Sequence, residues 1–267
     1  MGIDPAYEAP EAWHAALAAL AWQVDLGVGD VIGDMPINRY ELVEAAVVAP
    51  VAMPVKAAPV AVAAVPSGDG AVAAAKAAAV GARTLDELRA ALAGFEHCEI
   101  KQGARSLVFG DGNHAARVLI LGEAPGSEED REGRPFVGAA GQLLDKMFAA
   151  IGLDRGAAEA REAVYITNVM PWRPPQNRDP SADEIAMMRP FVERHIALVN
   201  PDVIVLMGNT PCAAILGQRG ILKLRGIWAE ALGKPVLPMA HPAYLLRNPI
   251  AKREAWADLL AIKGKLG

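Results

Sequence analysis

Three segments of this chain gather the side chains that could do chemistry, and the first of them is acidic. It runs from Gly122 to Gly138 and follows a short apolar run. Its carboxylates include Glu123 and Glu129, which could hold a water molecule or exchange a proton. Its aromatic residue, Phe136, could stack on a flat ring. The segment has neither a Gly-x-Gly-x-x-Gly pattern nor the lysine of a phosphate-binding loop, so it does not predict a nucleotide-cofactor site.

The second and third segments supply amides, arginines and a histidine. Between residues 167 and 178, prolines frame amides and two cations, among them Asn168, Arg173, Asn177 and Arg178. Between residues 241 and 247 the chain places an imidazole, an apolar run and another cation: His241, Tyr244, Leu245, Leu246 and Arg247. A neutral imidazole can donate a hydrogen bond to a developing anion. An amide can match a pattern of donors and acceptors, and arginines suit phosphates.

The elements that must position these segments form an alternating pattern. Apolar runs predict strands at 117–121, 164–168, 202–207 and 235–239. Capping residues and periodicity predict helices at 84–93, 139–151, 181–199 and 211–216, and a terminal helix. This alternation predicts an α/β fold, a three-layer α/β/α architecture with a central, mainly parallel four-stranded sheet. Because ligands bind at the carboxyl ends of such strands, we expect the three segments to converge there.

The composition bounds the organisation of the chain. The 267 residues carry a net charge of −5, and residues 1–80 hold nine acidic and three basic side chains. We expect an N-terminal helical segment at 1–45, with a helix from Ala12 to Val24, an Ala/Val/Pro-rich linker at 46–80, and a catalytic domain at 81–267. Residues 1–80 could pack a helix on the domain or recruit a partner. Without a secretory signal or a clean membrane-spanning run, a cytoplasmic protein is expected.

Together the three segments resemble the motifs of the uracil-DNA glycosylase superfamily, closest to family 4. The pattern Gly-Glu-Ala-Pro-Gly, then Gly-Arg-Pro-Phe-Val-Gly, is met from Gly122 to Gly138. The pattern Ile-Thr-Asn, then Arg-Pro-Pro-x-Asn-Arg, is met from Ile166 to Arg178. The pattern His-Pro-x-Tyr-Leu-Leu-Arg is met from His241 to Arg247. The match runs over roughly residues 95–265 in the family's order and spacing, and it says nothing about residues 1–80.

The resemblance implies an enzyme of base excision repair that flips uracil out of DNA and hydrolyses its N-glycosidic bond. His241 would stabilise the leaving uracil anion, and Glu129, helped by Glu123 and Asn177, would place the attacking water. Uracil would be held by Phe136, Asn168, Gly122 and Ala124. The apolar run would enter the duplex and nearby cations would contact phosphates, a set of six residues: Tyr244, Leu245, Leu246, Arg247, Arg173 and Arg178.

The expected partner is uracil-containing DNA, single- or double-stranded, bound by a monomer that does not associate with membranes. The resemblance to family 4 would imply a [4Fe–4S] centre, which four cysteines hold in that family. Here Cys98 matches one ligand, while Phe95, Trp172 and Met188 stand at the other three positions. Since four thiolates are needed, we expect no cluster, no metal and no diffusible cofactor, and we expect these large side chains to pack together instead.

Three alternatives remain at this point. One branch of the superfamily traps uracil-DNA covalently through a histidine in a basic insertion, near residues 222–226 of this chain, where no histidine stands. A catalytically silent DNA-binding module would not need the complete set of predicted catalytic residues. A nucleoside hydrolase on the same frame would leave the apolar run from Tyr244 to Leu246 without a purpose. Turnover on uracil-containing DNA is therefore the favoured interpretation.

Overall fold

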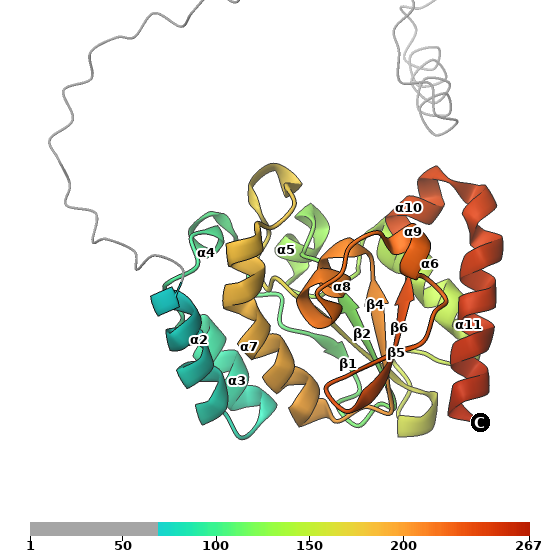
Figure 1. The fold of residues 1–267 in the computed structure, drawn as a ribbon, viewed down its shortest axis with the longest axis horizontal. Coiled ribbons are helices and arrows are strands. Elements are labelled where there is room, and N and C mark those ends of the chain that lie inside the picture. Colours follow the sequence, from blue (N-terminus) through green and yellow to red (C-terminus); the bar gives the residue numbers. More distant parts are fainter. Residues whose placement is uncertain (1–68) are drawn as a thin grey trace, which may run out of the picture. The chain divides into compact units, whose positions relative to one another are not determined.

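The computed structural model describes residues 69–267, so the helix expected at Ala12–Val24 and residues 46–68 of the expected linker lie outside the described residues. The described part is built on a six-stranded sheet in the order β1-β3-β2-β4-β6-β5 (Figure 1). Its four inner strands are parallel, and each lies within two residues of a predicted strand: β2 (Val118–Gly122), β3 (Val164–Asn168), β4 (Val203–Met207) and β6 (Lys234–Met239).

Two short antiparallel strands complete the edges of the sheet. β1 (Asp111–Gly112) pairs with β3, and β5 (Ala229–Ala231) pairs with β6. The expectation of four strands is therefore wrong in number, while the α/β class and the mainly parallel sheet are confirmed. Neither edge strand has an apolar run or a clear alternation of two, so the sequence gives no strand signal there.

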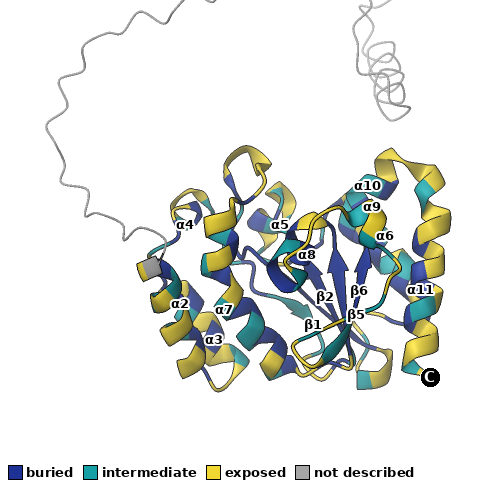
Figure 2. Ribbon diagram, viewed as in Figure 1, coloured by how far each residue is buried: buried dark blue, intermediate teal, exposed yellow. Residues whose placement is uncertain are grey.

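The parallel strands form because both of their faces are covered. β2, β3 and β4 are buried along their whole length, which is why they read as unbroken runs of Val, Ile and Leu. Alternate side chains enter two separate cores: Leu119 and Leu121 lie in one, and Val118 and Ile120 in the other. Figure 2 shows these buried strands between helices whose outer surfaces are exposed.

Helices cover both faces of the sheet. The core that contains Leu119 is closed by α3 (Leu85–Ala93), α7 (Ala182–Val199) and α8 (Asn209–Leu216). The core that contains Val118 is closed by α6 (Ala139–Ala149), α10 (Pro242–Arg247) and α11 (Lys252–Leu266). The remaining short helical elements lie in connections: α4 (Ile100–Gly103), α5 (Ser127–Glu132), α9 (Ile221–Leu224), η2 (Ala160–Glu162), η3 (Pro175–Asn177) and η4 (Pro249–Ala251).

The first described helix corrects one expectation. α2 (Asp69–Gly81) occupies the last part of the segment expected to be a linker, so the linker interpretation is wrong for residues 69–80. Ala71, Ala75 and Ala79 recur every four residues and are buried, and α2 packs against α3 and α7. Alanine is the strongest helix former, and small side chains let neighbouring helices approach closely. Within residues 69–267, no helix is both long and apolar enough to cross a membrane.

Candidate active site

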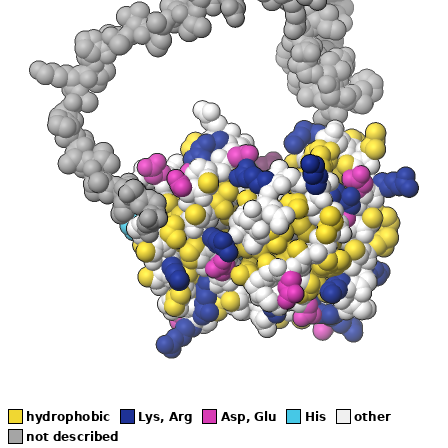
Figure 3. Space-filling model, viewed as in Figure 1, with side chains coloured by type: hydrophobic (Ala, Val, Ile, Leu, Met, Phe, Trp, Pro, Cys, Tyr) yellow, Lys and Arg dark blue, Asp and Glu magenta, His cyan; other side chains and the backbone are white. Residues whose placement is uncertain are grey.

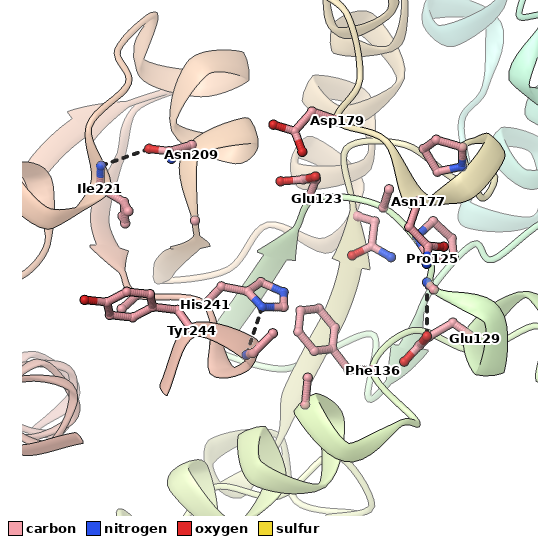
Figure 4. A pocket seen from close by; sticks show the side chains of 18 of the residues that line it. Glu123, Pro125, Glu129, Phe136, Asn177, Asp179, Asn209, Ile221, His241 and Tyr244 are labelled. Carbon is pink, nitrogen blue, oxygen red and sulfur yellow. Dashed lines mark hydrogen bonds between the residues drawn. The ribbon is translucent and has the colours of Figure 1, made fainter. Parts of the chain in front are cut away.

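A cavity of about 770 Å³ opens at the carboxyl ends of the parallel strands. Its walls come from the loops after β2, β3 and β6, as the sequence predicts, and also from the loop after β4 (Figure 4). Ten of the predicted site residues line it: Glu123, Ala124, Glu129, Phe136, Asn168, Asn177, Arg178, His241, Tyr244 and Arg247. The structure thus brings most of the predicted site together in one hollow.

An aromatic ring and an imidazole lie side by side in this cavity. The rings of Phe136 and His241 are stacked, with centroids 5.4 Å apart and planes inclined by 29°. Gly122 lies against the Phe136 ring and does not line the cavity. A Cβ atom there would lie 2.5 Å from the Phe136 ring and 2.2 Å from Oδ1 of Asn168. The glycine at the end of β2 therefore lets the ring and the amide approach each other.

Asn168 ends β3 and is 6% exposed. Its Oδ1 atom is buried and has no hydrogen-bond partner among the described residues. The neighbouring Thr167 hydroxyl donates to the carbonyl of Phe109 at 2.7 Å, which fixes the strand end. Because buried polar atoms in proteins are nearly always paired, the carboxamide of Asn168 offers unused hydrogen-bonding capacity at the cavity wall.

His241 is neutral at pH 7 and has a defined tautomer. It caps the N-terminus of α10, where its Nδ1 accepts a hydrogen bond from the Ala243 amide at 3.2 Å. Burial, helped by Arg247 and opposed by Glu129, lowers the pKa of His241 to about 4. With Nδ1 used as an acceptor, the single proton of the neutral ring sits on Nε2. His241 can therefore donate one hydrogen bond to a developing anion.

The two predicted carboxylates have different surroundings. Glu129 accepts hydrogen bonds from the amides of Gly126 (3.0 Å), Val137 (3.1 Å) and Gly138 (3.0 Å), so it joins the start of α5 to the chain after Phe136. Glu123 accepts one from the hydroxyl of Thr210 at 2.8 Å. Burial, helped by nearby Asp179, raises the pKa of Glu123. Glu129 thus organises the loop that it lines, while Glu123 is held by a single hydroxyl.

The cations predicted to contact phosphate are partly engaged within the protein. Arg178 makes two hydrogen bonds to the carboxylate of Glu184, at 2.8 and 2.6 Å. Arg173 donates to Oδ1 of Asn177 at 2.8 Å. Arg247 makes no ion pair with the described residues. On the face shown in Figure 3, basic side chains stand at separate places, some along the upper edge near α10, and form no continuous stripe.

The apolar run after His241 is not one surface, because it is helical. In α10, Leu245 is fully buried and belongs to the core against α6, so its expected insertion into DNA is wrong. Tyr244 lines the cavity, and Leu246 is 44% exposed. Successive helical residues point about 100° apart, so consecutive residues of this run cannot share one face.

The three sequence motifs do not predict the wall formed by the loop after β4. Gly208, with a φ of 101°, turns the chain from β4 into α8, and Asn209 follows it into the cavity wall. The Oδ1 atom of Asn209 accepts hydrogen bonds from the amides of Gly220 (3.0 Å) and Ile221 (2.9 Å), which fixes α9 at the rim. The available signal was the Gly-Asn pair directly after a predicted buried strand.

The four positions that correspond to cluster ligands in family 4 do not fit a [4Fe–4S] centre. Phe95, Cys98, Trp172 and Met188 are all buried in one core, and they include a single thiol. Lys101 closes this corner by donating to the carbonyls of Ala93 (2.8 Å) and Phe95 (3.2 Å), with its ammonium 6.0 Å from the centre of the Trp172 ring. Within residues 69–267, no three His, Cys, Asp or Glu side chains are placed to hold a metal ion.

Comparisons with known proteins agree with this geometry. The chain is 42% identical over 154 residues to a type-4 uracil-DNA glycosylase of Thermotoga maritima, covering 57% of this chain and 77% of that protein. It is 36% identical over 190 residues to one from Sulfurisphaera tokodaii, covering 67% and 84%. It is 37% identical over 188 residues to one from Archaeoglobus fulgidus, covering 67% and 92%. Residues 109–260 match the family model described as the uracil DNA glycosylase superfamily, and the chain belongs to that superfamily.

Proposed function

We propose that this chain is a uracil-DNA glycosylase, which hydrolyses the N-glycosidic bond of uracil in DNA and leaves an abasic site. The observation that carries the proposal is the meeting of Phe136, Asn168 and His241 in one cavity. An aromatic face, an amide and a neutral imidazole are the groups that a flipped pyrimidine needs for stacking, recognition and departure. The activity named for the relatives supports the same substrate class.

Recognition of uracil is assigned to two side chains. Phe136 stacks on the extruded base, a contact worth about 1–3 kcal/mol that does not depend on base identity. Asn168 supplies identity, because its amide can accept from N3–H and donate to O4 of uracil, whereas cytosine presents the opposite pattern. The volume of the cavity lies in the range that holds ligands larger than a single base.

The chemistry follows from where charge develops. Breaking the bond leaves negative charge on the pyrimidine, and Nε2–H of His241 stabilises it by donating to uracil O2. The attacking water has to approach the cationic sugar, and we assign its placement to the two carboxylates that line the same cavity, Glu123 and Glu129. Glu129 already accepts three amide hydrogen bonds, so the second carboxylate, Glu123, has more capacity left for water. Tyr244, Leu246 and Arg247 contact the DNA around the flipped nucleotide.

The test is an excision assay on matched oligonucleotides. Uracil opposite guanine, uracil opposite adenine, single-stranded uracil-DNA and free deoxyuridine are incubated separately with the protein. We expect released uracil and alkali-labile abasic sites from the DNA substrates and none from the nucleoside. Release from deoxyuridine would indicate a nucleoside hydrolase, and a denaturation-resistant protein–DNA adduct would indicate covalent trapping. Binding without either product would contradict the proposal.

A substitution of Asn168 tests how the protein distinguishes uracil from cytosine. Asn168→Asp replaces the amide by a group without an N–H donor, so we expect the preference for uracil over cytosine to fall while the protein stays folded. The ratio of excision rates on uracil- and cytosine-containing strands measures this preference, and circular dichroism checks the fold. An unchanged ratio would assign base recognition to another side chain.

A further inference from the structure

The stacking residue Phe136 is held in an uncommon backbone conformation. Its φ is 53°, in the left-handed region that bulky residues rarely adopt without support from their surroundings. Its side chain is only 6% exposed, so the ring has a defined place in the cavity wall. A relaxed backbone would turn the ring away from His241. Something in the structure must therefore hold this turn.

One guanidinium, that of Arg155, binds the backbone carbonyls of the turn at Phe136. Arg155 lies in the connection between α6 and β3, and its side chain is 15% exposed. Its NH1 donates to the carbonyl of Pro135 at 2.9 Å and its NH2 to the carbonyl of Phe136 at 2.9 Å. Two successive carbonyls can meet the planar fork of one arginine only while the turn at Phe136 is kept.

Two carboxylates orient the guanidinium. Nε donates to Oδ1 of Asp145 on α6 at 2.8 Å, and NH1 donates to Oδ2 of Asp111 on β1 at 3.1 Å. The short edge strand β1 thus positions an acid for this arginine. The helix leaves room for the carbonyl as well, because a Cβ atom at Gly141 would lie 1.9 Å from the oxygen of Phe136. On the other side of the turn, Glu129 binds the amides of Val137 and Gly138.

We propose that Arg155 is a positioning residue for uracil excision: it fixes the Phe136 ring in its stacking position through the two carbonyls, without touching the substrate. This inference rests on the proposed function. Arg155 does not line the cavity. Its removal therefore takes away no group that contacts the base and weakens only the support of the Phe136 ring.

A double-mutant cycle tests the assignment. Arg155→Ala should lower kcat/KM for uracil excision by about tenfold, the lower end of what a stacking contact contributes. In a Phe136→Ala background the same substitution should have almost no further effect, since the ring it positions is gone. Arg155→Lys should recover part of the loss, because an ammonium can bind one carbonyl. Arg161→Ala is the matched control: the Arg161 side chain is 76% exposed, lies in the same connection and, among the described residues, forms an ion pair with Glu162 alone.

A second measurement separates positioning from general stability and does not need activity. Amide hydrogen exchange at Val137 and Gly138 should become faster in Arg155→Ala and stay unchanged in Arg161→Ala, while amides of β2 and β4 remain protected. An equal loss of activity in both backgrounds, or uniformly faster exchange, would make Arg155 merely structural and overturn the inference. If the wild-type protein releases no uracil at all, the proposed function fails, and the exchange experiment still decides whether Arg155 holds the turn.

Discussion

At the scale of single residues, burial decides the charge of the imidazole in the cavity. His241 donates from Nε2 because its surroundings keep it neutral and the Ala243 amide occupies Nδ1. A neutral donor near uracil O2 strengthens as negative charge grows there, so its contribution belongs to the transition state. On the proposed function, binding of intact DNA should depend on it far less.

This difference between catalysis and DNA binding can be tested. His241→Ala should lower kcat for uracil excision by about 10²-fold or more, as the loss of one oxyanion donor does, while the Kd for uracil-DNA stays nearly unchanged. Single-turnover excision and fluorescence anisotropy on the same oligonucleotide measure the two quantities. Parallel losses in both would show that His241 is needed for structure and not for the departure of uracil.

A second buried histidine affects stability. His195 on α7 bonds the hydroxyl of Tyr165 at 2.9 Å, and burial, with a contribution from His114, lowers its pKa from 6.5 to about 3. The unfolded chain takes up this proton at higher pH than the folded one. The stabilisation is therefore complete above pH 6.5 and is lost as the pH falls towards 3, by at most about 1.4 kcal/mol per pH unit.

The expected result is a difference in acid sensitivity. His195→Gln can keep a hydrogen bond to Tyr165 but cannot titrate, so its free energy of unfolding should fall less steeply between pH 6 and pH 4.5 than that of the wild type. Urea unfolding at several pH values gives both slopes. Identical slopes would mean that His195 does not titrate on unfolding.

The residues that could be predicted are those whose types form motifs. Asn168 and His241 stand at or next to predicted strand ends, Phe136 lies in the segment that follows the first predicted strand, and the rule for parallel sheets brings the three together. Arg155 could not be found in this way, because its role depends on two carbonyls and on carboxylates 44 and 10 residues away. A hydrogen bond to a backbone carbonyl does not require a particular residue type at the acceptor, so the sequence pattern does not reveal it.

At the scale of elements, the helical conformation of α10 places adjacent residues of one sequence motif on different faces. Its sequence places three large apolar side chains in a row, yet the core takes Leu245 and leaves Leu246 at the surface. The position of each side chain around the helix axis decides this outcome. A linear motif read without its secondary structure therefore assigned DNA contact to a core residue.

The two leucines make a matched pair of variants. Leu246→Ala should lower excision from duplex DNA by about tenfold, the equivalent of partly burying one leucine, and leave single-stranded DNA unaffected because no stack needs filling there. Leu245→Ala should lower the free energy of unfolding by about 2–5 kcal/mol. Duplex-to-single-strand rate ratios and urea unfolding test the pair. A duplex-specific defect in Leu245→Ala alone would reverse the assignment.

Helices and strands with a clear hydrophobic pattern or capping residues could be predicted from the sequence, and elements without such a signal could not. The inner strands have unbroken apolar runs, and α7 begins at a Ser181–Glu184 capping box. β1 and β5 exist because a neighbouring strand offers free hydrogen-bonding groups, which no local pattern records. α2 was misread because its alanines resemble a linker by composition, and only its contacts with α3 and α7 show that they form a core face.

At the scale of the whole molecule, one corner joins the segment after α3, the loop after β3 and α7 by apolar packing. Phe95, Trp172 and Met188 are 5%, 3% and 0% exposed, and Lys101 caps the corner with hydrogen bonds. Each such side chain contributes about 1.5–3 kcal/mol when buried. This packing takes the place of ligation at the positions where family 4 has cysteines.

The corresponding prediction concerns composition and stability together. The purified protein should be colourless and hold no stoichiometric iron, and a strong chelator should leave its Tm unchanged. Trp172→Ala should lower the free energy of unfolding by about 3–5 kcal/mol, because it opens the corner. Metal analysis, thermal melts and urea unfolding test these points. A brown preparation whose Tm falls with chelator would contradict them.

A corner made of carbon side chains and one ammonium also changes what the chain requires during synthesis. With Cys98 as its single thiol, this corner needs no sulfide donor or cluster-assembly machinery to form. Oxidants that break down inorganic cofactors find none to attack at this corner, where Cys98 is buried and burial raises the pKa of its thiol, keeping it protonated and unreactive. On the proposed function, this corner would therefore not depend on a cluster that the oxidative conditions that damage DNA could destroy.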